Sequence, residues 1–128
     1  MSTYIVNQAG GKGGKDYYGM TPINSGSTIT IRSGQYVDSI TINDTRLGGP
    51  KGEDDATLAL ESNEWVVRVE VRSGDYIDYI KFITNKGRTI SGGTDNKGVQ
   101  EEFNGKQLIA LSGKGGQFID SLSFLFEK

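Results

Sequence analysis

A nine-residue pattern occurs three times in this chain of 128 residues, and it constrains the fold more than any other feature. It reads Gly, any residue, aromatic, β-branched, Asp, any residue, apolar, any residue, apolar, and it occupies residues 34–42, 74–82 and 116–124. The aspartates of the three copies stand 40 and then 42 residues apart. A period of this length accommodates about four short strands with their turns. The pattern therefore predicts three similar structural units.

Alternation between apolar and polar residues predicts the secondary structure of these units. It runs through residues 28–32, 67–72 and 122–126, with the period of two that is typical of a half-buried strand. Within the first repeat, Ile40 and Ile42 share one alternation phase, and we expect them and their counterparts to face the core. No stretch of eleven or more residues has the spacing of an amphipathic helix. We predict an all-β protein with one domain over residues 1–128.

A second set of glycines also occurs three times, in residues 10–14, 48–52 and 92–98. Glycine permits positive φ and a close approach of another molecule to the backbone, so each segment is a candidate cradle of N–H groups. The first segment precedes the first repeat, whereas the last repeat ends the chain. We therefore expect a strand at Tyr4–Asn7 to close the sheet that contains residues 122–127. The same edge strand can instead exchange with a second copy, so a homodimer is an open alternative.

The sequence contains no Cys and no His. This excludes Ser-His-Asp and Cys-His nucleophile pairs, disulfides, haem ligands and the usual zinc sites, and we expect neither a cofactor nor a metal. The formal net charge is −2, without a basic face for nucleic acid, and no apolar run approaches the ~20 residues that span a bilayer. We expect no nucleic-acid partner and no membrane insertion. The first residues lack the pattern of a signal peptide, which predicts a cytoplasmic protein or one released without a signal peptide.

The three repeated aspartates, Asp38, Asp78 and Asp120, are the candidate functional residues. A carboxylate accepts hydrogen bonds from two adjacent hydroxyl groups, while the N–H groups of a turn donate to the oxygens of the same ligand, so together they suit a neutral sugar. Such charge-assisted bonds contribute on the order of 1.5 to 3 kcal/mol each, which makes a weak but specific monosaccharide site. The structural alternative is that each Asp only caps its turn by accepting backbone hydrogen bonds.

The three Gly-x-aromatic-β-branched-Asp segments, together with the glycine-rich loops, resemble the jacalin-related lectins over nearly the whole chain. The resemblance implies the β-prism I fold, in which three four-stranded Greek-key sheets surround a pseudo-threefold axis. It also implies that each Asp accepts hydrogen bonds from O4 and O6 of mannose or glucose, while main-chain amides donate to other sugar oxygens. Galactose-binding members use a new N-terminus made by chain cleavage. This chain runs uninterrupted through residues 10–14, which favours the mannose-specific type.

The resemblance also assigns a glycine-rich loop to each Asp. Residues 48–52 belong with Asp38, residues 92–98 with Asp78 and residues 10–14 with Asp120. Counted from the first Gly-Gly of each loop, the fifth residue is Gly52, Asn96 and Gly14, so an altered or silent site is an alternative at Asp78. The implied carbohydrate-binding residues are Gly34, Tyr36, Val37, Asp38 and Gly52 in one site, Gly74, Tyr76, Ile77, Asp78 and Asn96 in the next, and Gly116, Phe118, Ile119, Asp120 and Gly14 in the last.

Two other functions stay open at this stage. A glycoside hydrolase needs two carboxyl groups about 5 to 9.5 Å apart, and Asp75 or Glu101 would have to supply the second one. A structural or protein-interaction module with the same fold and decayed sugar sites is the other alternative. We expect instead a non-catalytic lectin that binds mannose- or glucose-type glycans through up to three sites.

Overall fold

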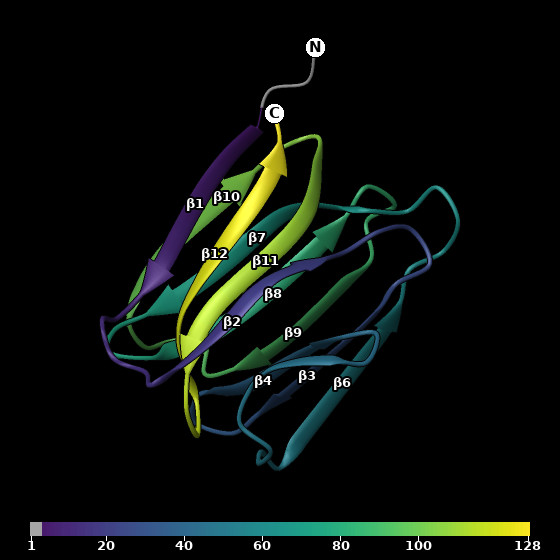
Figure 1. Cartoon of the computed structure of the whole chain (residues 1–128). Helices are drawn as coiled ribbons and strands as arrows, with labels where there is room; N and C mark the ends of the chain where they lie inside the picture. Colours follow the sequence, from purple (N-terminus) through teal and green to yellow (C-terminus); the bar gives the residue numbers. More distant parts are fainter. Residues whose placement is uncertain (1–3) are drawn as a thin grey trace.

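The computed structural model describes residues 4–128 as twelve strands in three four-stranded antiparallel sheets (Figure 1). The part of the chain that it describes contains no helix long and apolar enough to cross a membrane. In spatial order, sheet A consists of β1 (Tyr4–Gly10), β12 (Ile119–Glu127), β11 (Gln107–Gly115) and β2 (Asp16–Pro22). Sheet B consists of β5 (Thr45–Gly48), β4 (Val37–Ile42), β3 (Thr28–Ser33) and β6 (Asp54–Ala59), and sheet C of β10 (Val99–Asn104), β7 (Val66–Ser73), β8 (Ile77–Thr84) and β9 (Thr89–Gly93).

Each sheet has the same Greek-key connectivity. The two strands of a repeat form the central hairpin, a third strand extends it on one side, and the fourth strand crosses over to the other side. In sheets B and C these four strands follow one another in sequence, whereas sheet A combines β11 and β12 from the end of the chain with β1 and β2 from its beginning. The predicted all-β, β-prism I architecture with pseudo-threefold symmetry is confirmed.

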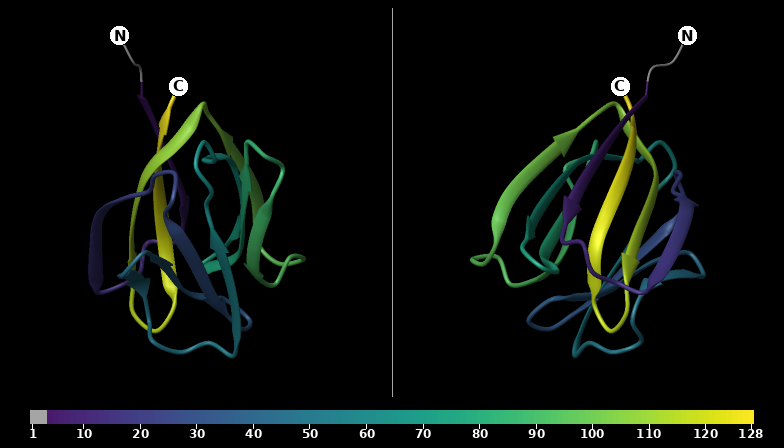
Figure 2. Two further views of the ribbon diagram at one scale, coloured as in Figure 1. Left: turned by 90° about the vertical axis from the view of Figure 1, so that its right-hand side faces the viewer. Right: turned by 60° about the vertical axis from the view of Figure 1, so that its left-hand side comes forward.

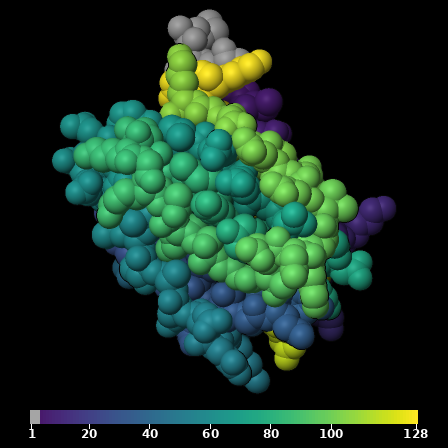
Figure 3. All heavy atoms as spheres, turned by 180° about the vertical axis from the view of Figure 1, so that it is seen from behind, coloured from purple at the N-terminus to yellow at the C-terminus, as the bar shows by residue number. Residues whose placement is uncertain are grey.

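The N-terminal strand closes the third unit, as the order of repeats and loops predicts. Tyr4 lies opposite Glu127 and Asn7 opposite Phe124 in the pairing of β1 with β12. Figure 2 shows β1 and β12 side by side. Most of the opposite face of the molecule is made by the strands of sheet C, in teal and green (Figure 3).

The core lies between the three sheets, and alternate residues of each repeat fill it. Ile40 and Ile42 on β4 are 0% and 1% exposed, and their counterparts on β8 and β12 are buried as completely. Burying such a side chain contributes roughly 1.5 to 3 kcal/mol relative to leaving it exposed. The largest fully buried side chains are Phe82, Phe124 and Phe126.

A buried carboxylate connects sheets B and C at the end of β8 remote from Asp78. The Glu64 side chain is fully buried, and Arg88 donates to it through Nη2 at 2.6 Å and Nε at 3.0 Å. The Thr84 hydroxyl donates to Oε2 at 2.7 Å, and Arg88 also donates to the Ala59 carbonyl at 2.7 Å. The hydrogen bond from Arg88, assisted by those from the Glu61 amide and Thr84, outweighs burial and lowers the pKa of Glu64 to about 2.

We expect Glu64→Gln to lower the free energy of unfolding at pH 7 by roughly 2 kcal/mol, because it removes the charge from a buried and fully bonded carboxylate. Because the pKa of Glu64 is lowered on folding, the wild-type contribution is complete above the ordinary value of 4.5 and is lost as the pH falls towards about 2. The variant lacks this part of the acid dependence. Urea denaturation at neutral and acidic pH measures both effects.

Glu61→Gln is the matched control. The Glu61 carboxylate is 58% exposed and lies 3.7 Å from Lys86 Nζ, and exposed pairs of this kind contribute about 0.2 to 1 kcal/mol. An equal loss of stability in both variants would contradict the role given to Glu64.

Candidate functional site

The three repeat turns meet at one end of the prism. They connect β3 to β4, β7 to β8 and β11 to β12, and all three close with the same main-chain hydrogen bond. The amide of the first glycine donates to the carbonyl of the aromatic residue, at 3.0 Å for Gly34 and Tyr36, 3.0 Å for Gly74 and Tyr76, and 2.9 Å for Gly116 and Phe118.

The aromatic residues of these turns pack against one another. The ring centroids of Tyr36 and Tyr76 are 4.9 Å apart, those of Tyr36 and Phe118 also 4.9 Å, and those of Tyr76 and Phe118 5.3 Å. The tilted and edge-on arrangements are the ones that aromatic pairs prefer. We call these three residues the aromatic triad. It holds the three turns together around the pseudo-threefold axis.

Each repeated Asp binds its glycine-rich loop through its main-chain carbonyl. The carbonyl of Asp38 accepts from the Gly49 amide at 2.9 Å. The carbonyl of Asp78 accepts from the Thr94 amide at 2.7 Å, and that of Asp120 from the Gly11 amide at 2.9 Å. The structure therefore brings together the three pairs of Asp and loop that the resemblance implies.

The side chains of the three aspartates are largely buried and accept no hydrogen bond from another side chain of the described residues. Asp38, Asp78 and Asp120 are 5%, 7% and 8% exposed. Within residues 4–128, no other side chain donates a hydrogen bond to their carboxylates. Burial raises the pKa of all three carboxyl groups, against the opposing charges of Arg32 at Asp38, Lys97 at Asp78 and Lys114 at Asp120. Their acceptor capacity remains available to an external donor.

Hollows open beside two of these carboxylates. The one at Asp38 has a volume of about 400 Å³, and its lining includes Tyr36, Gly52 and Phe118. The one at Asp120 has a volume of about 260 Å³, and its lining includes Gly14, Tyr76 and Phe118. Each hollow is therefore bordered by a triad ring from another repeat. The β-branched residue of each repeat is fully buried, so its side chain packs in the core. These residues are Val37, Ile77 and Ile119.

The glycine loops align differently from the sequence-based count. Gly10, Gly48 and Gly93 have φ of 114°, 108° and 99°, and a Cβ atom on any of them would collide with the carbonyl of its Asp. The third loop therefore begins its alignment at Gly93 rather than Gly92. In all three loops the next strand begins six residues after this glycine, so the third loop is not longer than the others.

Gly98, rather than Asn96, lies against the carboxylate of Asp78. A Cβ atom on Gly98 would collide with Asp78 Oδ2, and its φ is 77°. Gly14 and Gly52 also have positive φ but lie one position earlier in the aligned loops, where the third loop has Lys97. Asn96 is exposed and lines a separate hollow that does not include Asp78. Counted from Gly93, the fifth loop residue is Lys97, and Gly98 follows it. The assignment of Asn96 to the sugar site stays a prediction.

A cation that was not predicted from the sequence supports each loop. Arg32 Nη2 donates to the Gly52 carbonyl at 3.2 Å, and Arg72 Nη1 donates to the Gly98 carbonyl at 3.3 Å. Lys114 Nζ donates to the Lys12 carbonyl at 3.4 Å. A usable signal was present, because each cation stands two residues before the first glycine of its repeat.

Residues 6–125 match the family of the jacalin-like lectin domain. The chain belongs to this family. It is 34% identical to griffithsin from Griffithsia sp. (strain Q66D336) over 119 residues, which cover 93% of each protein. The predicted family and the prediction of a non-catalytic carbohydrate-binding lectin are confirmed.

Solved structures show that the lectin has the same fold as other jacalin-related proteins. A mannose-specific jacalin-related lectin from Morus nigra, in complex with mannose, has a TM-score of 0.83 at 17% identity, over 99% of this chain and 95% of that one. Wild-type Malaysian banana lectin has a TM-score of 0.82 at 24% identity, over 98% of this chain and 97% of that one.

The residues considered for a hydrolase do not support that alternative. Asp75 is exposed on its turn. Glu101 lines a hollow with Gly10 and Gly74, and none of the three repeated aspartates borders it. Since the chain is a lectin, binding without catalysis is its function.

We expect Gly98→Ala to destabilise the lectin more than Gly87→Ala. Both glycines have similar positive φ, 77° and 78°, and a left-handed conformation costs an L-residue roughly 1 to 2 kcal/mol. A Cβ on Gly87 would meet nothing within 4 Å, whereas one on Gly98 would collide with Asp78. Urea unfolding of both variants measures the difference, and equal free energies would disprove the contact between Gly98 and the carboxylate.

Proposed function

We propose that this lectin binds glycans through mannose or glucose residues, with one sugar at each of the Asp38 and Asp120 sites and a third, altered site at Asp78. The observation that carries the proposal is a largely buried carboxylate that accepts no hydrogen bond from another side chain and lies beside a glycine-rich loop. Burying a carboxylate without side-chain donors costs folding free energy. A ligand that donates hydrogen bonds to the carboxylate best explains why the fold retains it. Adjacent hydroxyl groups of a pyranose are donors at the spacing that two carboxylate oxygens accept.

The shape of the sites supports a terminal or single sugar residue. The hollows at Asp38 and Asp120 are open and lie at or below the small end of the range for ligand pockets. A triad ring at the edge of each hollow provides an apolar surface for the C–H face of a sugar. The description of the Morus nigra lectin as mannose-specific and the unbroken loop at residues 10–14 support mannose over galactose.

The arrangement of the sites supports multivalent binding. All three lie around the aromatic triad at one end of a rigid prism, so a branched glycan or a glycan-dense surface meets them together. Repeated weak sites raise the overall affinity by ~10² to 10⁴ without new contacts. The Asp78 site differs from the others because its loop has Lys97 at the position of Gly14 and Gly52, and the positive-φ glycine, Gly98, comes one residue later.

Calorimetric titration with methyl α-mannoside tests the site assignment. Because each charge-assisted hydrogen bond contributes about 1.5 to 3 kcal/mol, we expect Asp38→Ala and Asp120→Ala each to remove one binding site, with the affinity at that site at least tenfold lower. The double variant should retain at most the Asp78 site. Asp44→Ala, at an exposed turn, is the control and should bind as the wild type does. Unchanged stoichiometry in the double variant would refute the proposal.

The same titration at decreasing pH tests the protonation state that the sites need. A neutral carboxyl group is a weaker acceptor than a carboxylate, so protonation reduces affinity. Because burial raises the pKa of Asp38 and Asp120 above 3.8, we expect affinity to fall at a higher pH than for an exposed aspartate. Asp38→Asn with Asp120→Asn should bind weakly at every pH. Constant wild-type affinity down to pH 4 would contradict a carboxylate acceptor.

The expectation of a homodimer stays a prediction. Within this chain β1 pairs with β12, and its Tyr4 and Val6 are 53% and 58% exposed at the edge of sheet A. Location in the cytoplasm, or release without a signal peptide, also stays a prediction.

A further inference from the structure

The three units differ at the boundaries where the edge strand of one sheet faces the next sheet. We call these three boundaries the seams. In each unit the fourth strand of the Greek key carries one residue at an equivalent position. These residues are Tyr18 on β2, Ala56 on β6 and Glu101 on β10. They pair with Gly113, Ile31 and Val71, each of which precedes the loop-supporting cation by one residue. Three different side chains therefore stand where adjacent sheets meet.

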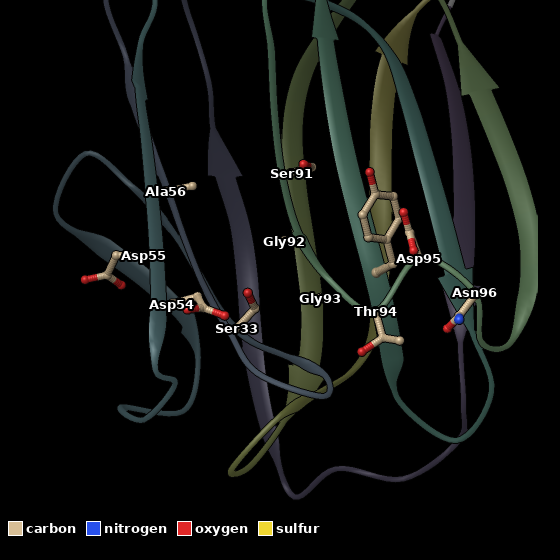
Figure 4. Close-up of a pocket in the computed structure, with 11 residues that line it drawn as sticks. Ser33, Asp54, Asp55, Ala56, Ser91, Gly92, Gly93, Thr94, Asp95 and Asn96 are labelled. Carbon is tan, nitrogen blue, oxygen red and sulfur yellow. The ribbon is translucent and has the colours of Figure 1, made fainter.

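Tyr18 fills the seam between sheets A and B. Its ring is packed against the core, and its hydroxyl donates to the Gly48 carbonyl across the seam at 3.3 Å. At the seam between sheets B and C, the residue equivalent to Gly48 is Gly93. The methyl group of Ala56 is too short to reach it. A hollow of about 600 Å³ opens there between β6 and β9 (Figure 4).

The hollow is lined mainly by hydroxyl, carboxylate and amide groups. Ser33 is only 4% exposed, its side chain borders the hollow, and the described residues provide no hydrogen-bond partner for its hydroxyl. Gly92 keeps this hydroxyl accessible, because a Cβ atom there would lie 2.9 Å from Ser33 Oγ. The remaining polar lining residues are Asp54, Asp55, Tyr79, Ser91, Thr94, Asp95 and Asn96.

The charges of the hollow select against acidic ligands. It is lined by three aspartates and by no lysine or arginine. Arg32 Nε lies 3.1 Å from Asp55 Oδ1 and offsets the charge of only that one. Hydroxyl groups and carboxylates are the partners of a neutral polyol, which donates to the carboxylates and accepts from the hydroxyl groups.

We propose that the hollow between β6 and β9 is a further carbohydrate subsite that binds a neutral hexose residue of an oligosaccharide. This proposal rests on the proposed function, because the subsite extends the glycan surface that begins at the Asp sites. Residues 93–98 connect the two regions: Gly98 lies against the Asp78 carboxylate, while Gly93, Thr94 and Asp95 border the hollow. A glycan with several residues contacts both regions, whereas a monosaccharide at an Asp site leaves the hollow empty.

Ala56→Tyr fills the hollow with the side chain that occupies the equivalent seam in this same protein. We expect its affinity for mannotriose to fall by about tenfold, the effect of one lost charge-assisted hydrogen bond, while its affinity for methyl α-mannoside stays at the wild-type value. Glu101→Tyr is the matched control, since it places the same ring at the equivalent position in the third seam. Unchanged mannotriose binding by Ala56→Tyr, or an equal loss in Glu101→Tyr, would overturn the subsite.

A second measurement keeps the proposal testable if the tyrosine variant does not fold. In ¹⁵N-labelled wild-type protein, mannotriose should shift the amide resonances of Asp55 and Ala56, and Ser33→Ala should reduce that shift. Methyl α-mannoside should shift the loops at the Asp sites and leave the resonances of Asp55 and Ala56 unchanged. Mannotriose shifts confined to the loops at the Asp sites would overturn the subsite and leave the proposed function intact. Absence of any shift with methyl α-mannoside would instead overturn the proposed function.

Discussion

The sites depend on one hydrogen bond that occurs three times, from the second residue of a glycine-rich loop to the main-chain carbonyl of a repeated Asp. In the Asp120 unit it joins residues at opposite ends of the chain, Gly11 and Asp120. Since this bond occupies only the carbonyl, it places the loop at the aspartate while leaving the carboxylate free. A side chain at the preceding glycine would occupy the same space, which explains Gly10, Gly48 and Gly93.

Two kinds of buried carboxylate show how stability and function divide between the ends of the prism. Glu64 has donors from Arg88, Thr84 and a main-chain amide, so its pKa is lowered and its charge supports the fold. Asp38 and Asp120 are 5% and 8% exposed and accept no hydrogen bond from another side chain, so burial raises their pKa. Above these raised values the ionised groups reduce the stability of the native state. The ionised aspartates therefore lower the stability of the lectin at the end where ligand acceptors are needed. The Glu64 carboxylate stabilises the sheets at the other end.

The repeats share a backbone but differ where side chains face the seams and loops. Gly98 occupies a different place in its loop from Gly14 and Gly52. Tyr18, Ala56 and Glu101 make one filled seam and two hollow ones. Three copies of one fold unit can therefore present different surfaces to a ligand, because the hydrogen-bonded ladders do not require the same side chains at these positions.

The sequence by itself determined the strand pattern, the three units and the aspartates, because alternation and a repeated motif are visible along the chain whatever the tertiary contacts are. The pairing of loops with aspartates followed from family resemblance. Only the tertiary structure decided that Gly93 starts the third loop, that the aromatic triad forms, that Glu64 meets Arg88 and that Ala56 leaves a hollow. These features depend on how residues from separate repeats approach one another when the sheets close around the axis, and a one-residue shift within a loop changes them without changing the local pattern.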